Sequence, residues 1–510
     1  MRRISAFQIL SRSGPVMAPK QQKHTQYSHA IGLLFLAFAL LSPAVSIAET
    51  PDVSASVDAA DSSIARGRYL ALAADCAACH TNGREGMPFA GGYPVPSPFG
   101  PIYSTNITPS LSHGIGSYSR AEFARSLREG VRQDGANLYP AMPYTSYARL
   151  SDQDISDLYD YLMQTVAPVD RSAPETHLPF PFSMRAALGP WKTLNLNAEP
   201  VSQTGTPEDE SLERGRYLVD GLAHCAECHS PRTLTLGTDP SRYLRGGAVG
   251  PWYAPDITNS SQGIGGWSDD DLEAYLKTGI APQDRAAGPM AEAIEHSFQH
   301  LTHTDITSIV NYLRSVPTSA QSEAVDAESK TGAKPVPAAF DLNLVNGRRD
   351  QTEIAGIADG ALLYNAVCAS CHQPDGSGTP DGYYPPLVGI GTVTSSNPTN
   401  LVATILYGVD RETQGREILM PGFGTDSPVQ RLSDEQVAAI STYVVARFGV
   451  GQTRVTGAQV GQVRSGGARP VIARLAAPSI LYGATALFLV IAIALVAVVL
   501  RRLRPRSQNI

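Results

Sequence analysis

Apolar residues recur every three or four positions in three related segments, 150–162, 301–313 and 432–444. This spacing predicts three helices, each with one buried face. At the start of each helix, and of a further helix in the first two regions, a serine or threonine is followed three positions later by an acidic or amide residue, which predicts a capping box. The pairs are Ser151 with Asp154, Thr302 with Asp305, Ser433 with Gln436, Ser119 with Glu122, and Ser268 with Asp271.

Between the helical segments lie long loops, and the chain contains 45 glycines and 38 prolines among its 510 residues. No segment alternates apolar and polar residues well enough to predict a strand. The pattern therefore predicts an all-α fold with Gly- and Pro-rich loops.

Two regions repeat each other. "RGRYL" occurs at 66–70 and 214–218, and "NITPSLSHGIG" at 106–116 returns as "DITNSSQGIG" at 256–265. A more divergent third region shares the last helix, so we predict three tandem domains, at 60–175, 208–317 and 352–449. Polar stretches at about 195–210, 317–350 and 449–474 predict flexible connections, the last being a linker over 450–474.

Both ends of the sequence indicate that most of the chain lies outside the cytoplasm. A short apolar run with basic residues upstream ends at Ser46-Ile47-Ala48, which predicts a signal peptide over 1–48; Met17 is a second possible start, and an uncut membrane anchor is the alternative. Residues 475–500 carry no charge and precede "RRLRPR", which predicts a transmembrane helix with a cytoplasmic tail at 501–510 and a periplasmic remainder. A helix buried in a soluble core is the alternative.

The net charge is −7 and the sequence shows no basic stripe, so a nucleic-acid partner is not expected. All six cysteines lie in three C-x-x-C-H motifs, with a histidine directly after each second cysteine. Paired thiols at this spacing can form thioethers with the two vinyl groups of a haem, and the histidine then binds the iron. The residues are Cys76, Cys79 and His80; Cys225, Cys228 and His229; and Cys368, Cys371 and His372.

Two other chemistries use paired cysteines. A zinc site would need further soft ligands in each domain, and no cysteine remains to supply them. A thiol–disulfide centre would need a strand-helix-strand setting, which the pattern does not predict. Three covalently bound haem c groups are therefore the prediction.

The second axial ligand of each iron is predicted by elimination. After His372 the only methionine is Met420, and between His229 and Cys368 the only one is Met290, although His296, His300 and His303 compete there. In the first domain Met87, Met142, Met163 and His113 compete, and we select Met142 because its distance of 62 residues from His80 is close to the 61 between His229 and Met290. Core packing is the alternative role for each methionine.

A methionine opposite the histidine fills both axial positions and raises the potential, which is typical of a haem that transfers electrons and binds no substrate. The three centres then form a relay. A domain that kept a five-coordinate iron could instead carry out oxygen or sulfur chemistry. In the third domain we expect the carbonyl of Pro385 to orient His372.

Several motifs resemble a known family: "RGRYL", "DCAACHT", "PIYSTNITP", "LYPAMPY" and "HCAECHSPR" are similar to those of the three-haem cytochrome c subunits of membrane-bound bacterial dehydrogenases. That family includes quinohaemoprotein alcohol dehydrogenases and flavin-dependent gluconate, sorbitol and fructose dehydrogenases. The resemblance covers about residues 60–450, and in the third domain it is mainly to cytochrome c in general. It implies three tandem cytochrome c domains with His–Met ligation.

The resemblance also implies a function. A separate catalytic subunit containing flavin or pyrroloquinoline quinone would pass electrons to this chain, which would deliver them to ubiquinone at the periplasmic side of the inner membrane. No Gly-rich dinucleotide fingerprint follows a predicted strand, so catalysis is expected on the partner chain. The alternatives are a self-sufficient multihaem enzyme, such as a thiosulfate-oxidising one, and a free-standing conduit to a terminal oxidase.

Overall fold

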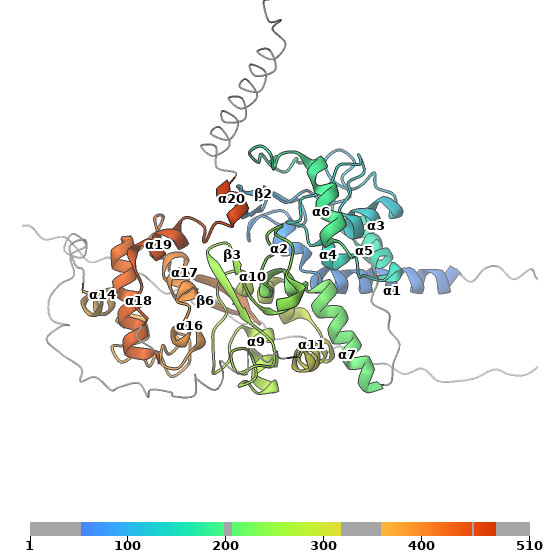
Figure 1. The fold of residues 1–510 in the computed structure, drawn as a ribbon. Coiled ribbons are helices and arrows are strands. Elements are labelled where there is room, and N and C mark those ends of the chain that lie inside the picture. Colours follow the sequence, from blue (N-terminus) through green and yellow to red (C-terminus); the bar gives the residue numbers. More distant parts are fainter. Residues whose placement is uncertain (1–52, 198–206, 318–358, 451–452, 476–510) are drawn as a thin grey trace, which may run out of the picture. The chain divides into compact units, whose positions relative to one another are not determined.

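A computed structural model describes residues 53–197, 207–317, 359–450 and 453–475 (Figure 1). The predicted signal peptide at 1–48 and the predicted cytoplasmic tail at 501–510 lie outside these residues. Most of the expected connection at 317–350 does so as well.

Helices dominate each domain. The first contains α1 (Val53–Ala73), α2 (Cys76–His80), β1 (Pro94–Val95), β2 (Ile102–Tyr103), α3 (Arg120–Glu129), α4 (Tyr144–Tyr147) and α5 (Asp152–Gln164), and is followed by η1 (Arg185–Ala187) and α6 (Leu188–Asn195). The second contains α7 (Pro207–Tyr217), the π-helical turn η2 (Leu218–Leu222), α8 (Ala226–His229), η3 (Pro240–Arg242), β3 (Arg245–Val249), β4 (Trp252–Asp256), α9 (Asp269–Thr278), α10 (Gly288–His296), η4 (Phe298–His300) and α11 (His303–Ser315). The third contains α14 (Gly360–Val367), α15 (Ala369–His372), α16 (Gly391–Thr394), α17 (Thr399–Tyr407), β5 (Val409–Thr413), β6 (Arg416–Met420) and α18 (Asp434–Phe448), followed by α19 (Gly457–Arg464) and α20 (Val471–Leu475).

In each domain the first helix crosses the last at a glycine. A Cβ atom at Gly67 would lie 1.9 Å from the carbonyl oxygen of Asp157, and one at Gly215 would lie 1.9 Å from that of Ser308. At Gly360 the distance to the carbonyl oxygen of Ala439 would be 2.2 Å. Only glycine permits so close an approach, so the three pairs α1–α5, α7–α11 and α14–α18 share one packing arrangement.

The all-α prediction is wrong in one respect, because each domain contains a two-stranded antiparallel ribbon. The pairs are β1–β2, β3–β4 and β5–β6, with Val95 opposite Ile102, Gly247 opposite Ala254, and Val409 opposite Met420. The strands have two to five residues and include Gly and Pro, so they have no room for the alternation that marks a strand in sequence.

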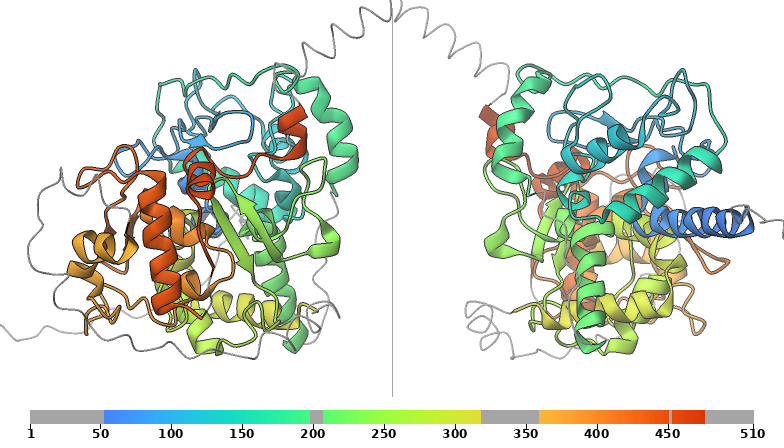
Figure 2. Two further views of the ribbon diagram at one scale, coloured as in Figure 1. Left: turned by 60° about the vertical axis from the view of Figure 1, so that its left-hand side comes forward. Right: turned by 90° about the vertical axis from the view of Figure 1, so that its right-hand side faces the viewer.

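Two hydrophobic cores hold the described residues together. The first is continuous through the first and second domains: Leu150 and Leu158 belong to it together with Leu218 and Ile294. The second core belongs to the third domain, yet Trp252 from β4 of the second domain packs against it. Figure 2 (left) shows the β3–β4 ribbon, in green, next to the orange helices of the third domain, where β4 contacts α17.

The first two domains exchange tyrosines from their "RGRYL" repeats. The Tyr69 hydroxyl donates to Asp305, with 2.5 Å between the oxygens, and accepts from the backbone N–H of Thr302. Reciprocally, the Tyr217 hydroxyl donates to Asp154 and accepts from the backbone N–H of Ser151. Each tyrosine thus binds the first turn of the other domain's last helix.

This exchange corrects part of the capping prediction. Ser151, Thr302 and Ser433 do accept from the backbone N–H three residues later, but only Ser119 with Glu122 and Ser433 with Gln436 complete the capping box among the predicted pairs. Asp154 and Asp305 accept the tyrosine hydroxyls instead, and Asp271 accepts a hydrogen bond from Gln283. At Asp154 and Asp305 the hydrogen-bond donor is therefore a tyrosine hydroxyl from the other domain, where a capping box would have the N-cap backbone N–H.

The third domain joins the second through its own contacts. Arg411 of β5 is 1% exposed, and its guanidinium donates to the carbonyl oxygen of Ala286 at 2.7 Å. The Asn400 side chain pairs with the backbone of Tyr253, accepting from its N–H at 2.9 Å and donating to its carbonyl at 2.8 Å. These bonds fix the β5–β6 ribbon and α17 against the second domain.

The expected flexible linker over 450–474 contains the helix α19. Its residues Val460 and Val463 are buried in the core of the third domain together with Val455, and Arg464 forms a 2.7 Å ion pair with Asp434 at the start of α18. The mainly polar composition of this stretch suggested a flexible linker, but these three valines extend the core of the third domain.

The predicted transmembrane helix is also corrected. Throughout the ranges that the structure describes, no helix is both long enough and apolar enough to cross a bilayer. The last described helix, α20, has five residues, includes Arg474 and ends at Leu475. Residues 476–500 of the predicted segment lie outside the described part. The described residues therefore do not support the predicted transmembrane helix.

Candidate haem sites

Short helices carry the three C-x-x-C-H motifs. In α2, α8 and α15 one turn of helix brings the two thiols to the same side, with the histidine in the next position. All six thiols are partly buried and none forms a disulfide. Burial raises the pKa of the first cysteine of each motif, namely Cys76, Cys225 and Cys368, to about 12.

Burial therefore disfavours the thiolate at these three cysteines, whereas a redox-active cysteine needs its thiolate. Within the described ranges, no group of three or more His, Cys, Asp or Glu side chains is arranged to hold a metal ion. The donor set at each motif is two thiols and one imidazole, which fits a haem attached by thioethers.

A backbone carbonyl orients each histidine. The Nδ1 atom of His372 lies 3.0 Å from the carbonyl oxygen of Pro385, so the predicted contact is confirmed. The equivalent contacts are His80 with Thr105 at 2.6 Å and His229 with Pro255 at 2.7 Å. An N–H donated from Nδ1 places the lone pair on Nε2, the atom left for the iron.

Sequence reasoning missed these two carbonyls, although the repeated "NIT" and "DIT" segments directly after Thr105 and Pro255 signal a shared structural role. Burial lowers the pKa of His80, His229 and His372, and the carbonyl contact opposes that effect. Each imidazole is therefore neutral at physiological pH, which is the state that binds a metal.

In the first domain the four competing ligands lie in different settings. Met142 is partly buried and packs against the core shared by the first two domains. Met163 also packs there but belongs to the long helix α5. Met87 is 53% exposed, and His113 is exposed with its Nδ1 bonded to Ser112.

In the second domain Met290 is the third residue of the helix α10 and packs, partly buried, against the shared core. His300 and His303 are exposed, the first in contact with the carbonyl of Glu295 and the second 3.3 Å from the Glu273 carboxylate. His296 is partly buried at the end of α10. Met290 and His296 are thus the two side chains of this group that the fold shields.

In the third domain Met420 ends strand β6 and packs against the core of that domain, as do Cys368 and Trp252. The strand pairing sets Met420 opposite Val409. A Cβ atom at Gly408 would lie 2.3 Å from the carbonyl oxygen of Met420, so the turn before β5 touches the methionine's own backbone.

The first two motifs lie close together across the domain boundary. Helix α10, which carries Met290, contacts α2 of the first domain. Tyr93 of the first domain donates to Glu292 at 3.1 Å, and Thr145 donates to Glu227, within the second motif, at 2.7 Å. The sequence alone does not indicate which of the three sites are neighbours.

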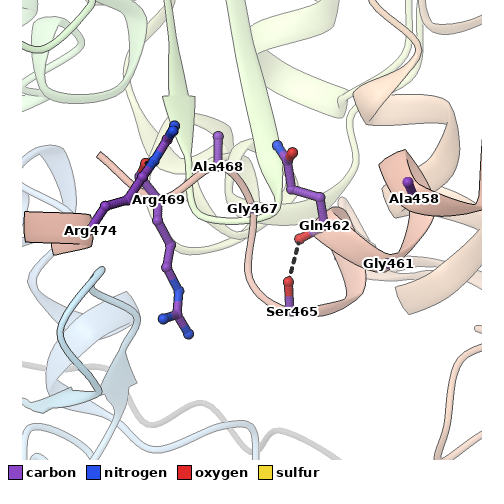
Figure 3. Close-up of a pocket in the computed structure, with 8 residues that line it drawn as sticks. All are labelled: Ala458, Gly461, Gln462, Ser465, Gly467, Ala468, Arg469 and Arg474. Atoms are coloured by element: carbon purple, nitrogen blue, oxygen red, sulfur yellow. Dashed lines mark hydrogen bonds between the residues drawn. The ribbon is translucent and has the colours of Figure 1, made fainter. Parts of the chain in front are cut away.

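A pocket of about 450 Å³ lies elsewhere, at the ends of α19 and α20 (Figure 3). Arg469 and Arg474 line it together with Gln462, whose carbonyl accepts from Ser465 at 3.0 Å. None of the predicted haem-binding residues reaches this pocket, so it does not belong to the three sites.

Comparison with known proteins follows the same division. The family model described as cytochrome c matches three stretches of the chain, 64–165, 212–317 and 357–447, and each contains one C-x-x-C-H motif. With the cysteine pairs at 76/79, 225/228 and 368/371, the chain carries three covalently bound haem c groups.

Several curated proteins are similar over most of their length. The fructose dehydrogenase cytochrome subunit of Gluconobacter japonicus is 51% identical over 89% of this chain and 94% of its own. The gluconate 2-dehydrogenase cytochrome c subunit of Pantoea cypripedii is 38% identical over 79% of this chain and 90% of its own. The cytochrome c subunit of the quinone alcohol dehydrogenase of Gluconobacter oxydans is 36% identical over 77% and 80%.

Proposed function

Because the chain belongs to the cytochrome c family, among the three-haem cytochrome subunits of dehydrogenase complexes, we propose that it transfers electrons from a catalytic dehydrogenase subunit to ubiquinone. The observation that carries this proposal is the triple site itself: three pairs of thiols, each followed by a histidine whose Nδ1 is bonded to a carbonyl. When bound, haem c supplies a one-electron redox couple.

We assign the proximal ligands to His80, His229 and His372, each through Nε2. The carbonyl contacts hold the imidazole planes in place and keep one tautomer. For the opposite face we assign Met142, Met290 and Met420. Support comes from their partial burial against the cores, while Met87, His113, His300 and His303 are exposed.

This assignment predicts a specific spectroscopic result. Met142→Ala, Met290→Ala and Met420→Ala should each remove about one third of the methionine-to-iron absorbance band and lower one of three midpoint potentials, because a thioether favours reduced iron. Met87→Ala and Met163→Ala serve as controls and should leave the band whole. If Met290→Ala changes nothing while His296→Ala does, the second domain has a bis-histidine centre.

The catalytic partner is proposed to resemble fructose dehydrogenase, since the fructose dehydrogenase relative is more similar to this chain than the gluconate and alcohol dehydrogenase relatives above. Such a partner would carry flavin, and a quinoprotein partner is the alternative. We further propose that the complex acts at the periplasmic side of the inner membrane.

Purification through a tag after mild solubilisation tests this function. We expect a flavin or quinoprotein dehydrogenase in stoichiometric amount, identified by mass spectrometry, and reduction of all three haems when its substrate is added. Reduction of a short-chain ubiquinone by the same preparation tests the acceptor. A chain that purifies alone and whose reduced spectrum changes with carbon monoxide would contradict the proposal and favour a self-sufficient enzyme.

A further inference from the structure

Trp252 lies where the second and third domains meet. It is the first residue of β4 in the second domain, yet its side chain packs against the core of the third. The centroid of its indole ring lies 6.2 Å from that of Tyr407, the last residue of α17. An aromatic pair therefore spans the boundary between these two domains.

In the second domain, Trp252 lies near the residues that position both proposed axial ligands, His229 and Met290. Three residues further along β4, the carbonyl of Pro255 accepts from Nδ1 of His229 at 2.7 Å. The indole also lies against Gly288, where a Cβ atom would approach the ring to 2.4 Å. Gly288 precedes Met290 by two residues in α10. Any side chain at 288 would push the indole away, so this contact requires glycine.

On the side of the third domain, Tyr407 is adjacent to the remaining methionine. It is followed by Gly408, where an added Cβ atom would lie 2.3 Å from the carbonyl oxygen of Met420. Val409, next along the chain, is the strand partner of Met420. Through this contact, one residue, Gly408, separates Tyr407 from the backbone of the proposed ligand of the third haem.

Hydrogen bonds hold this arrangement in place. The residue after Trp252, Tyr253, exchanges two backbone bonds with the side chain of Asn400, at 2.9 and 2.8 Å. Asn400 lies in α17, the helix that ends at Tyr407. The Tyr407 hydroxyl in turn donates to the carbonyl of Val463 in α19 at 2.9 Å. Both rings are thus fixed by contacts outside the pair.

We propose that Trp252, together with Tyr407, forms the path by which electrons pass between the second and third haems. The inference deepens the proposed function and rests on its axial ligands. With haem c bound at the second and third sites, each exchange would transfer one electron, so that oxidation of one iron would balance reduction of the other. No bond forms or breaks, no proton moves, and the indole and phenol stay neutral throughout.

The physical reason is packing. Electron tunnelling weakens less steeply through atoms in van der Waals contact than through a gap, and protein interiors are packed densely enough to supply such contacts. Replacing the indole by a small side chain would leave a cavity that its neighbours fill only in part. The two haems would then be coupled through a longer path along β4 and the Asn400 bonds.

The test measures redistribution of electrons among the haems after a pulse of photoreduction in the holoprotein. Freeze-quenched electron paramagnetic resonance follows each ferric haem separately. Trp252→Leu should slow exchange between the second and third haems by about tenfold or more, and Trp252→Phe, which keeps an aromatic ring, should fall between wild type and Trp252→Leu. Trp267→Leu is the matched control, an indole removed from the same domain but from a T-shaped pair with Tyr275.

Midpoint potentials and haem content separate the possible failures. Unchanged exchange in Trp252→Leu, with three intact haems, would overturn the path while leaving the proposed function standing. A wild-type chain that purifies without a dehydrogenase and whose reduced spectrum changes with carbon monoxide would overturn the proposed function itself. If Trp252→Leu does not fold, Tyr407→Leu and Tyr407→Phe provide the same comparison at a half-exposed position. The proposed path requires slower electron exchange in Tyr407→Leu than in Tyr407→Phe.

Discussion

The first two domains and the third are joined in different ways. The first pair shares one continuous core and exchanges Tyr69 and Tyr217 in a nearly symmetric manner, each tyrosine binding the other domain's last helix. The third domain has Leu362 at the corresponding position after its crossing glycine, keeps its own core, and docks through Arg411 and Asn400.

This difference shows what duplication can do for an interface. When two copies of a domain face each other, a favourable contact on one copy occurs twice, as in a two-fold symmetric dimer. A divergent domain has no such partner and must build an asymmetric contact. The first two haem sites are therefore held as a unit, and the third is linked to that unit by a separate set of residues.

The largest effect should come from the crossing glycines. Gly215→Ala would force its Cβ atom against the carbonyl of Ser308, at a cost of about 3 kcal/mol or more, and Gly360→Ala should cost a similar amount. Since the first core is shared, Gly215→Ala should lower the unfolding temperature of the first and second domains together. Gly360→Ala should affect the third alone. Calorimetry with the haem circular dichroism signal distinguishes the two patterns.

Gly189→Ala is the control, because the added carbon would meet no atom within 4 Å apart from its chain neighbours and the backbone of its own helix. It should leave all transitions in place. Independent unfolding of the first two domains in Gly215→Ala would contradict the shared core.

Removal of Arg411 should release the third domain. Arg411→Ala leaves the carbonyl of Ala286 without its donor and creates a cavity, which should weaken docking by about 2 kcal/mol. Limited proteolysis between the second and third domains should become faster. Arg416→Ala, at an exposed arginine in the same ribbon, should not change it. Equal protection in both variants would show that Arg411 is not the main contact.

Removal of one hydroxyl from the tyrosine exchange should have a smaller effect. Tyr69→Phe and Tyr217→Phe each delete a hydrogen bond to a carboxylate, and each should reduce the free energy of unfolding of the pair by about 1.5 kcal/mol. Near-symmetry predicts similar values for the two variants, and chemical denaturation measures them. A large effect of one with none of the other would show that the exchange is symmetric in geometry only.

The smallest expected effect is a pH dependence of opposite sign at the two boundaries. At Asp305 burial opposes ionisation, but hydrogen bonds from Arg214 and Tyr69 outweigh it, and the pKa of this carboxyl lies below its ordinary value. Its ionised form therefore stabilises the first boundary above about pH 4, and this stabilisation is lost as the pH falls further.

Asp284, which accepts from Thr392 of the third domain, has its pKa raised by burial. Its contribution is present below about pH 4 and is lost as the pH rises through the raised pKa. Thermal unfolding from pH 3 to 7 should show each dependence, of less than about 1 kcal/mol, and Asp305→Asn and Asp284→Asn should abolish them one at a time. Parallel behaviour of the two boundaries would contradict this assignment.

Much of the haem sites could be predicted from local sequence. The spacing of Cys368, Cys371 and His372 determines their chemistry within one turn of helix, and the last helix of each domain is visible in the pattern with its N-cap. The ribbons, the α19 helix and the carbonyl partners of His80 and His229 could not be predicted in the same way. The strands of the ribbons are too short to show an alternating pattern. The carbonyl partners lie about 25 residues from His80 and His229.

By itself, the sequence determined the number of haems, the residues that attach them and the helical scaffold, because these depend on spacings of a few residues. Only the tertiary structure decided which domains share a core, why Asp154 and Asp305 bind tyrosines, and where Trp252 lies. The physical reason is distance along the chain: Tyr69 and Asp305 are 236 residues apart. Their pairing depends on how two whole domains pack, which no local pattern contains.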